Sequence, residues 1–275
     1  MLQKLAVIGL CLGSLTPSLA LAAGPEKPSQ RPNLNLDNLK KALDSGDEAR
    51  ALAALDEIEL AAEVRAAPLV EALLARGASG KLVLRAISVA SALGKGSSSA
   101  ALAPYVKHRA PEVRRAAARA LARTKGPLAV QSLRDALRGA DPALRSAAAE
   151  GLGLLGAKEA VPDLFVVLPK EVPEAAGAIG ALCSADDCKK FVALLGKLPF
   201  EVMESGFLPL LLRTGTDVPD PVKLRLIEQL RRLATQKANA LLSTALASFP
   251  ANGEPKIKTA LDAALHGHTV TGGEP

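Results

Sequence analysis

Apolar residues recur every 31 positions along most of this chain. The row of anchors consists of Leu102, Leu133, Leu164, Leu195, Leu226 and Ile257. Four positions after the anchors stand Val106, Leu137, Leu168, Leu230 and Leu261, and only Pro199 breaks this second row. Such a repeat is typical of stacked helical arrays, in which each unit buries its apolar face against its neighbours. The spacing predicts an all-α solenoid of about seven stacked antiparallel helix pairs.

Each repeat is predicted to hold a first helix of about 10 residues, a tight turn and a second helix of about 14. The second helix starting at Pro142 would bury one stripe, formed by Leu144, Ala147, Ala148, Gly151 and Leu152, and the same stripe lies 31 positions earlier on the helix starting at Pro111. Proline is tolerated at the first helical position, because the N–H there has no partner within the helix. Asp141 precedes Pro142 as an expected N-cap.

The stretch DPALRSAAAEGLGLLGAKEAVPDLFVVL, residues 141–168, closely resembles the HEAT repeat, especially the HEAT-like variety also found in phycobilisome lyases. The preceding unit reads APEVRRAAARAL, and the resemblance covers residues 67–187 well. It implies a right-handed superhelix whose second helices line the concave face. In proteins of this kind the arginine at the positions of Arg114 and Arg145 commonly bonds to a turn aspartate, which implies a structural role for both arginines and for Asp141. The alternative for the two arginines is a basic ladder on a binding surface.

The repeat becomes irregular towards both ends of the chain. Asp37 is an expected cap for the first short helix, and this first pair is out of register with the 31-residue row, as terminal units of solenoids often are. Downstream, Pro209 is expected to interrupt a helix, and the loop 214–221 is longer than the others. The spacing nevertheless continues from Leu210 and Leu211 to Leu241 and Leu242.

The first 23 residues are predicted to be a secretory signal peptide. Lys4 supplies a positive start, an apolar stretch follows, and Ala20-Leu21-Ala22 matches a small-x-small cleavage pattern next to Ala22 or Ala23. Cys11 raises lipoprotein anchoring as an alternative, but Leu10 stands where lipidation signals need a small residue. The predicted organisation is then a signal over 1–23, a proline-rich linker over 24–36, a solenoid over 37–266 and a flexible tail over 267–275. The protein is expected to be periplasmic or extracellular.

Cys183 and Cys188 are the two cysteines that remain after signal removal. They flank Ser-Ala-Asp-Asp, which reads as the end of one helix and the capped start of another, so a disulfide closing this joint suits an oxidising compartment. The alternatives are two small core residues or a redox pair. No histidine is close in sequence, which argues against a zinc site here.

Arg115, Arg119 and Arg123 lie on the side of their helix away from the buried stripe, and with Arg114 they form a local basic stripe. They are candidates for contact with an acidic partner; the alternative is a solvated helix face. The net charge of +6 falls to +5 when Lys4 is removed, and the charges are of mixed sign. Export makes nucleic acid the least suitable partner, and attachment to an anionic membrane or wall polymer is a weak alternative.

No catalytic motif stands out in the sequence. A phosphate-binding glycine loop, a His-Glu-x-x-His helix and a Gly-x-Ser-x-Gly elbow are all absent, and His266 and His268 lie in a tail with few carboxylates. We therefore expect no cofactor, no metal and no catalytic residue. The function expected is a non-enzymatic, monomeric scaffold for a protein partner, and the alternative is an enzyme or a lyase-type accessory of the HEAT-like family.

Overall fold

The computed structural model describes residues 34–266, which belong to one compact unit and contain fifteen α-helices and no β-strand. The odd-numbered helices are α1 (Leu36–Asp44), α3 (Ala67–Arg76), α5 (Ser98–Leu102), α7 (Ala129–Leu137), α9 (Val161–Val167), α11 (Ala185–Val192), α13 (Asp220–Leu233) and α15 (Pro255–His266). The even-numbered helices are α2 (Glu48–Ala61), α4 (Gly80–Leu93), α6 (Pro111–Thr124), α8 (Pro142–Leu155), α10 (Pro173–Leu182), α12 (Phe200–Leu212) and α14 (Gln236–Ala247). The signal-peptide and tail predictions, and the linker up to residue 33, lie outside the described residues.

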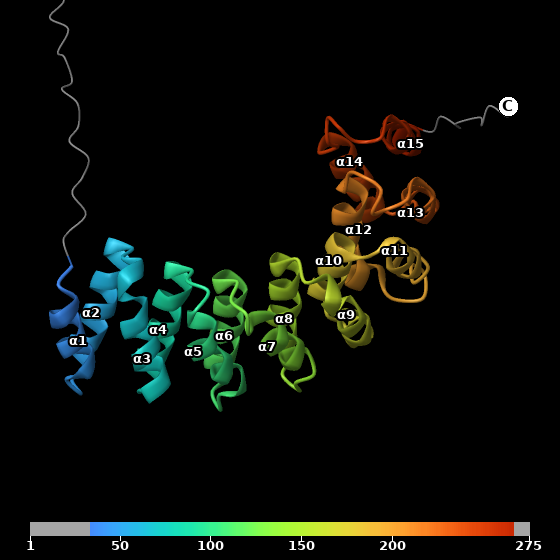
Figure 1. Cartoon of the computed structure of the whole chain (residues 1–275). Helices are drawn as coiled ribbons and strands as arrows, with labels where there is room; N and C mark the ends of the chain where they lie inside the picture. Colours follow the sequence, from blue (N-terminus) through green and yellow to red (C-terminus); the bar gives the residue numbers. More distant parts are fainter. Residues whose placement is uncertain (1–33, 267–275) are drawn as a thin grey trace, which may run out of the picture. The chain divides into compact units, whose positions relative to one another are not determined.

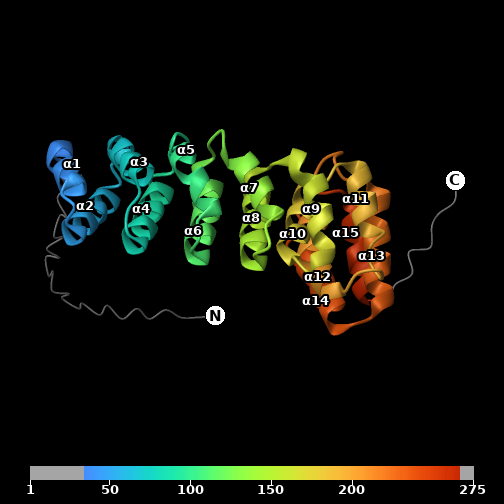
Figure 2. The ribbon, with the colours of Figure 1, turned by 90° about the horizontal axis from the view of Figure 1, so that it is seen from below.

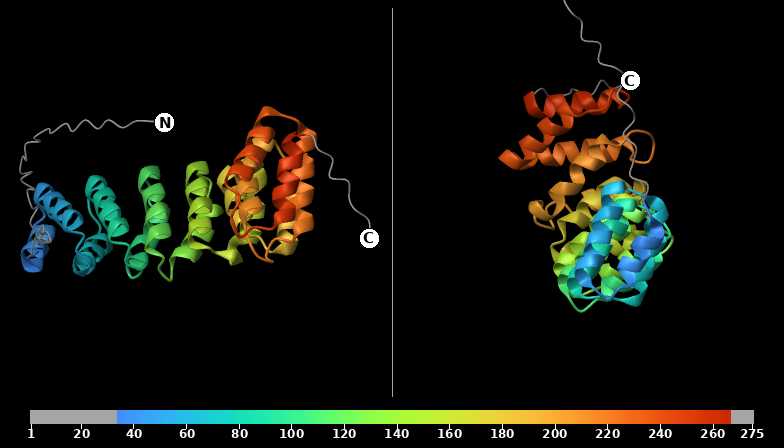
Figure 3. Two further views of the ribbon diagram at one scale, coloured as in Figure 1. Left: turned by 90° about the horizontal axis from the view of Figure 1, so that it is seen from above. Right: turned by 90° about the vertical axis from the view of Figure 1, so that its left-hand side faces the viewer.

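The helices form two layers (Figure 1). Each even helix contacts the next even helix up to α14. In the odd layer the contacts run from α1 to α3, from α3 to α5, from the 3-10 turn after α5 to α7, from α7 to α9, and from α11 through α13 to α15. Figures 2 and 3 show the same order from other sides, with α2, α4, α6 and α8 next to one another. We call these the even layer and the odd layer. Consecutive helices pack as pairs from α1 with α2 through α9 with α10 and again as α13 with α14, and these pairs confirm the predicted all-α solenoid.

Helix α8 shows how the sequence of one unit produces its local structure. The Asp141 side chain accepts hydrogen bonds from the amides of Ala143 and Leu144, and Pro142 is the first helical residue. The predicted stripe is buried on the core side. The helix ends at Gly156, whose φ of 69° lies in the left-handed region that glycine adopts without strain. The sequence prediction for this unit is confirmed.

Most anchors of the 31-residue row lie in the odd layer and are completely buried: Leu102, Leu133, Leu164, Leu226 and Ile257. Leu195 is the exception, because α11 ends at Val192 and leaves Leu195 half-buried in the following turn. Phe191 is the large side chain of α11 that enters the core instead. Equal spacing in the sequence therefore does not give this position an equal role.

Helix lengths depart from the prediction where prolines intervene. The first helices of two units stop early and continue as 3-10 turns, η2 (Ala103–Lys107) and η4 (Leu168–Lys170). Pro104 and Pro169 lie at the second residue of these turns and donate no backbone hydrogen bond to a preceding α-helical turn.

Two expectations about helix ends and breaks were wrong. The cap of α1 is Asn35, whose side chain accepts from the amides of Asp37 and Asn38, so Asp37 lies inside the first turn. Pro209 does not interrupt a helix, because α12 runs through it to Leu212. The buried side chains on either side of the proline, including Phe207 and Leu210, offset the hydrogen bond that Pro209 cannot donate.

Helices α10 and α12 approach each other closely, a feature that the repeat pattern does not predict. A Cβ atom added at Gly180 would lie 2.0 Å from the carbonyl oxygen of Gly206, and one added at Gly206 would lie 2.3 Å from the carbonyl oxygen of Ala176. Nearby, the Phe191 and Phe207 rings pack with their centroids 5.6 Å apart. Glycine is needed at both positions because the two backbones are in contact there.

Within residues 34–266 no helix combines the length and the apolar character needed to cross a membrane.

Candidate functional site

Polar contacts between neighbouring units recur at separations close to one repeat. The Tyr105 hydroxyl donates to the carbonyl of Leu74 at 2.6 Å, and Arg134 bonds to Asp163 at 2.6 Å. Arg85 contacts Asp56 and Glu59 at 2.7 and 2.6 Å. These side chains fix the spacing of successive units in addition to the apolar core.

Arg114 joins two units. Its guanidinium donates to the carbonyls of His108 and Arg109, both at 3.0 Å, and to the Asp141 carboxylate at 2.7 Å. The hydrogen bond from Arg114, followed by those from the amides of Leu144 and Ala143, holds the pKa of Asp141 below its usual value. Because the folded-state pKa is depressed, this contribution to stability is present above the unfolded-state pKa and is lost as the pH falls through the folded-state pKa.

Arg145 occupies the same position one unit later but lacks the ion pair. It donates to the carbonyls of Gly139 and Ala140 at 2.9 and 3.1 Å. One repeat after Asp141 the chain carries Val172, so no aspartate stands at the equivalent position of the turn that follows. The Arg145 Nε atom is buried without a hydrogen-bond partner within residues 34–266. The structure thus places both arginines at unit joints and gives the aspartate bridge only to Arg114.

Arg115, Arg119 and Arg123 lie on α6 in the even layer. Arg115 is half-buried, and its Nε donates to the carbonyl of Pro111 in its own helix at 3.2 Å. Arg119 and Arg123 are exposed, and neither guanidinium has an ion-pair or hydrogen-bond partner in the described part of the chain. The structure therefore brings the three predicted residues onto one helix and leaves two of their charges free.

The neighbouring helices add an apolar border to these arginines. One repeat after Arg123, α8 carries Leu154, which is 66% exposed, and one repeat before it α4 carries the exposed Ala92. We call the group formed by Arg115, Arg119, Arg123 and Leu154 the arginine surface. A free cation beside an exposed leucine can make an ion pair and an apolar contact with the same ligand.

The cysteine joint lies between α10 and α11. Cys183 follows the last residue of α10, Cys188 lies in α11, and their sulfur atoms are at disulfide-bonding distance, 2.10 Å. Both residues are completely buried. Arg213, at the end of α12, donates to the carbonyl of Cys183 at 2.8 Å. The joint is thus held covalently and also tied to the next unit.

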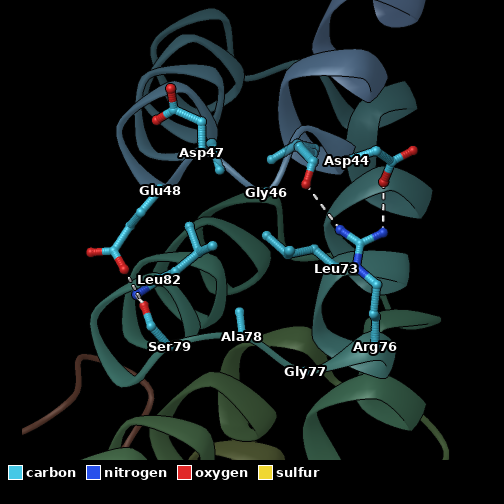
Figure 4. A pocket seen from close by; sticks show the side chains of 12 residues that line it. Asp44, Gly46, Asp47, Glu48, Leu73, Arg76, Gly77, Ala78, Ser79 and Leu82 are labelled. Atoms are coloured by element: carbon cyan, nitrogen blue, oxygen red, sulfur yellow. Dashed lines mark hydrogen bonds and ion pairs between the residues drawn. The ribbon is translucent and has the colours of Figure 1, made fainter.

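A cavity of about 270 Å³ separates the turns of the first two units. Figure 4 shows Arg76 facing Asp44 and Ser79 facing Glu48 across it; the two distances are 2.6 Å each. Asp47, also on its edge, accepts hydrogen bonds from two amides at the start of α2. The polar side chains of this cavity are engaged with one another, so the cavity acts as a joint between units.

The histidines and acids give no metal centre in residues 34–266, where no group of three or more metal-ligating side chains comes together. His266 is the last residue of α15 and contacts Asp262 of its own helix at 3.1 Å. His268 lies outside the described residues. His108 accepts a hydrogen bond from the amide of Ala110 at 3.1 Å and closes a local turn.

Sequence reasoning missed two residues of the cysteine joint, whereas it placed the outward-facing leucine of the arginine surface. Arg213 follows the last residue of α12 and lies 25 residues after Cys188 in the sequence. Lys223 is only 2% exposed, and its amine donates a hydrogen bond to the carbonyl of Arg213. Burial lowers the pKa of Lys223. One repeat after Arg115, Arg119 and Arg123 the chain reads Ser146, Glu150 and Leu154, so the sequence places Leu154 on the outward side and ends the basic stripe there; the structure adds that Leu154 is 66% exposed.

The comparisons with known proteins give a family match over part of the chain and several similar solved structures. A family model of HEAT repeats matches residues 66–140. No curated protein sequence matches the chain. Among solved structures, the chain is similar to the complex of CpcE and CpcF of phycocyanin lyase from Nostoc sp. PCC7120, at 19% identity and a TM-score of 0.48, over 88% of this chain and 100% of that chain. It is also similar to an engineered protein at 18% identity and a TM-score of 0.39, over 84% and 96% of the two chains.

The matched segment covers the units α3 with α4 and α5 with α6, together with α7. The same pairing of helices continues on both sides of this segment. Residues 66–140 therefore match HEAT repeats.

Proposed function

We propose that this protein is an exported, non-enzymatic, monomeric scaffold that binds an acidic protein partner through the even layer. The observation that carries the proposal is the pair of exposed arginines on α6, Arg119 and Arg123, whose charges are unpaired among the described residues. A stack of rigid units presents such groups in fixed positions, which lowers the ordering cost of binding.

The proposal assigns binding to the even layer because of how its helices pack. Even helices meet through alanine and glycine, as at Gly180 and Gly206, where the backbones touch. Odd helices carry larger buried side chains, such as Leu133 and Leu164. In a curved stack, the layer with the closer helix spacing lies on the inner side, which favours the even layer as the concave face.

A partner for the arginine surface needs carboxylates and an apolar residue. Carboxylates would pair with Arg119 and Arg123, and an apolar side chain would cover Leu154, which is exposed beside them. Such pairs steer association and weaken with salt, whereas the apolar contact does not. Binding that vanishes completely at high salt would instead favour simple attraction to an anionic polymer or membrane.

The non-enzymatic part of the proposal is supported by the state of the carboxylates. Asp141, Asp163 and Asp217 each contact an arginine or a lysine at 3.3 Å or less. The pKa of each carboxyl group is held below its usual value. A hydrogen bond from Arg114 lowers the pKa of Asp141, and one from Lys158 lowers that of Asp217. For Asp163, burial acts to raise the pKa, but hydrogen bonds from Arg134 and Arg138 keep it lowered. Carboxylates held ionised in this way are poor general acids.

Export is the part of the proposal that depends on the N-terminal sequence, together with a cysteine pair suited to an oxidising compartment. We expect the protein isolated from its host to begin after Ala22 or Ala23, as read by intact mass. Recovery of a chain that still carries residues 1–22 in the cytoplasm would contradict export.

Binding is tested by site-specific photo-crosslinking in the host. A photoreactive residue is placed at Leu154 of the even layer or, as a matched control, at Val166 of the odd layer, since both side chains are 66% exposed. We expect one defined crosslinked protein from position 154 and at least about tenfold less from position 166. Equal crosslinking at the two positions, or crosslinking at 166 alone, would contradict binding through the even layer.

A further inference from the structure

A cluster of charged groups surrounds the disulfide between Cys183 and Cys188. The Nη1 atom of Arg213 lies 3.6 Å from the sulfur of Cys183 and 3.9 Å from that of Cys188. The Arg213 side chain is only 15% exposed, so its charge acts on the sulfurs with little screening by water. A disulfide that served only as a cross-link would not need a guanidinium beside both of its sulfurs.

The surrounding contacts hold Arg213 in this position. Its side chain donates to the carbonyl of Cys183 at 2.8 Å and pairs with Asp217 at 3.2 Å. Its own carbonyl accepts a hydrogen bond from the buried amine of Lys223. Both the backbone and the side chain of Arg213 are therefore fixed with respect to the sulfurs.

The acidic groups near the joint are engaged with other cations. Asp217 also contacts Lys158 at 3.3 Å, and Asp187 contacts Lys190 at 3.2 Å and accepts from the hydroxyl of Ser184 at 2.7 Å. Arg213 thus shares its acidic partner, Asp217, with Lys158. A cavity of about 360 Å³, lined by Cys183, Ser184, Lys158 and Asp217, lies against the joint. Because both cysteines are completely buried, a thiol from this cavity reaches their sulfurs when the joint opens locally.

We propose that Cys183 and Cys188 form a redox-active pair that exchanges with thiols, and that Arg213 stabilises its reduced form. A thiolate of a monothiol of the glutathione class attacks one sulfur, forms a mixed disulfide and releases the other cysteine as a thiolate beside Arg213. A second monothiol thiolate attacks the mixed disulfide, releases the remaining cysteine and leaves as the oxidised monothiol. Two thiols thereby give two electrons and two protons to the protein disulfide.

The direction of the effect follows from the charge of Arg213. A neighbouring cation favours the thiolate, which exists only in the reduced protein, so it shifts the equilibrium towards reduction. Arg213 also bonds to the Cys183 carbonyl, and the joint between α10 and α11 is connected through it to the loop 213–219.

The test measures the equilibrium between the purified full-length protein and glutathione buffers. After acid quenching and alkylation, trypsin releases residues 171–189 as one peptide holding both cysteines, so its disulfide and doubly alkylated forms report the pair separately from Cys11. The midpoint is the ratio of the squared concentration of reduced glutathione to the concentration of oxidised glutathione at which half of the protein is reduced. Arg213→Gln should raise this ratio at least about tenfold, which lowers the reduction potential of this two-electron couple by about 30 mV. Arg231→Gln, which removes an exposed arginine of α13, is the matched control and should leave the midpoint unchanged.

The sign of the shift separates a charge effect from a packing effect. If Arg213 served only to hold the loop, its loss would ease reduction or leave the midpoint unchanged, and either result in a folded variant would overturn the proposal. Should Arg213→Gln fail to fold, Arg213→Lys decides the matter. That variant keeps the positive charge but loses the guanidinium that holds the Cys183 carbonyl, so an unchanged midpoint supports the proposal, and any shift of the midpoint overturns it.

Discussion

Replacing Gly180 with alanine is expected to lower the free energy of unfolding by about 3 kcal/mol or more, in spite of the better helix propensity of alanine. The added Cβ would lie 2.0 Å from the carbonyl oxygen of Gly206 and 2.7 Å from its carbonyl carbon. Both atoms belong to backbone, which cannot rotate away as a side chain can. The two helices must therefore separate, and the packing between α10 and α12 is lost along their length.

Gly177→Ala is the matched control, one helical turn away on the same face of α10. There the nearest atom to an added Cβ is the carbonyl oxygen of Ser205 at 3.7 Å, an ordinary contact. Alanine should be neutral or stabilising by about 1 kcal/mol at this position. Urea denaturation followed by far-UV circular dichroism measures both variants, and equal midpoints would contradict the close approach of the two helices.

Replacing Leu133 with alanine is expected to cost about 3 kcal/mol, whereas Leu195→Ala should cost about 1 kcal/mol or less. Leu133 is completely buried, and its side chain fills the space that Gly151 leaves open; a Cβ there would lie 2.9 Å from Leu133 Cδ1. Leu195 occupies the same place in the 31-residue row but lies half-buried after the end of α11. Truncation of the Leu195 side chain leaves an open surface depression that water can fill, whereas truncation of Leu133 leaves a closed cavity.

The same denaturation experiment compares the two leucine variants directly. A cost for Leu195→Ala equal to that for Leu133→Ala would mean that the repeat continues unbroken through the cysteine joint, against the structure. The unaltered protein and Gly177→Ala serve as references for the slope of the transition.

The fold was largely predictable because its causes are local in the sequence. Asp141, Pro142 and Gly156 each act on the backbone within one helix, and the buried stripe of α8 needs only helical periodicity. The departures have causes that come from elsewhere in the chain. Pro209 is tolerated because of what packs around α12, and no local rule contains that information.

The candidate sites were predictable only in part, because some of their residues come from distant parts of the sequence. The spacing of Arg115, Arg119 and Arg123 placed them on one helix face, and the structure adds that the neighbouring Leu154 is exposed. The cysteine pair could be predicted from its four intervening residues and an N-cap serine. Arg213 reaches that pair from another unit, so its role depends on how successive units stack.

The measurement that tests the scaffold proposal most directly is the crosslinking yield from position 154 after charge reversal. We expect R119E/R123E to lower the yield at least about tenfold, because two ion pairs are replaced by repulsion. K256E/K258E makes the same change in net charge at two exposed lysines of α15 and should leave the yield within about twofold. An unchanged yield in R119E/R123E, or an equal loss in both variants, would contradict binding through the arginine surface.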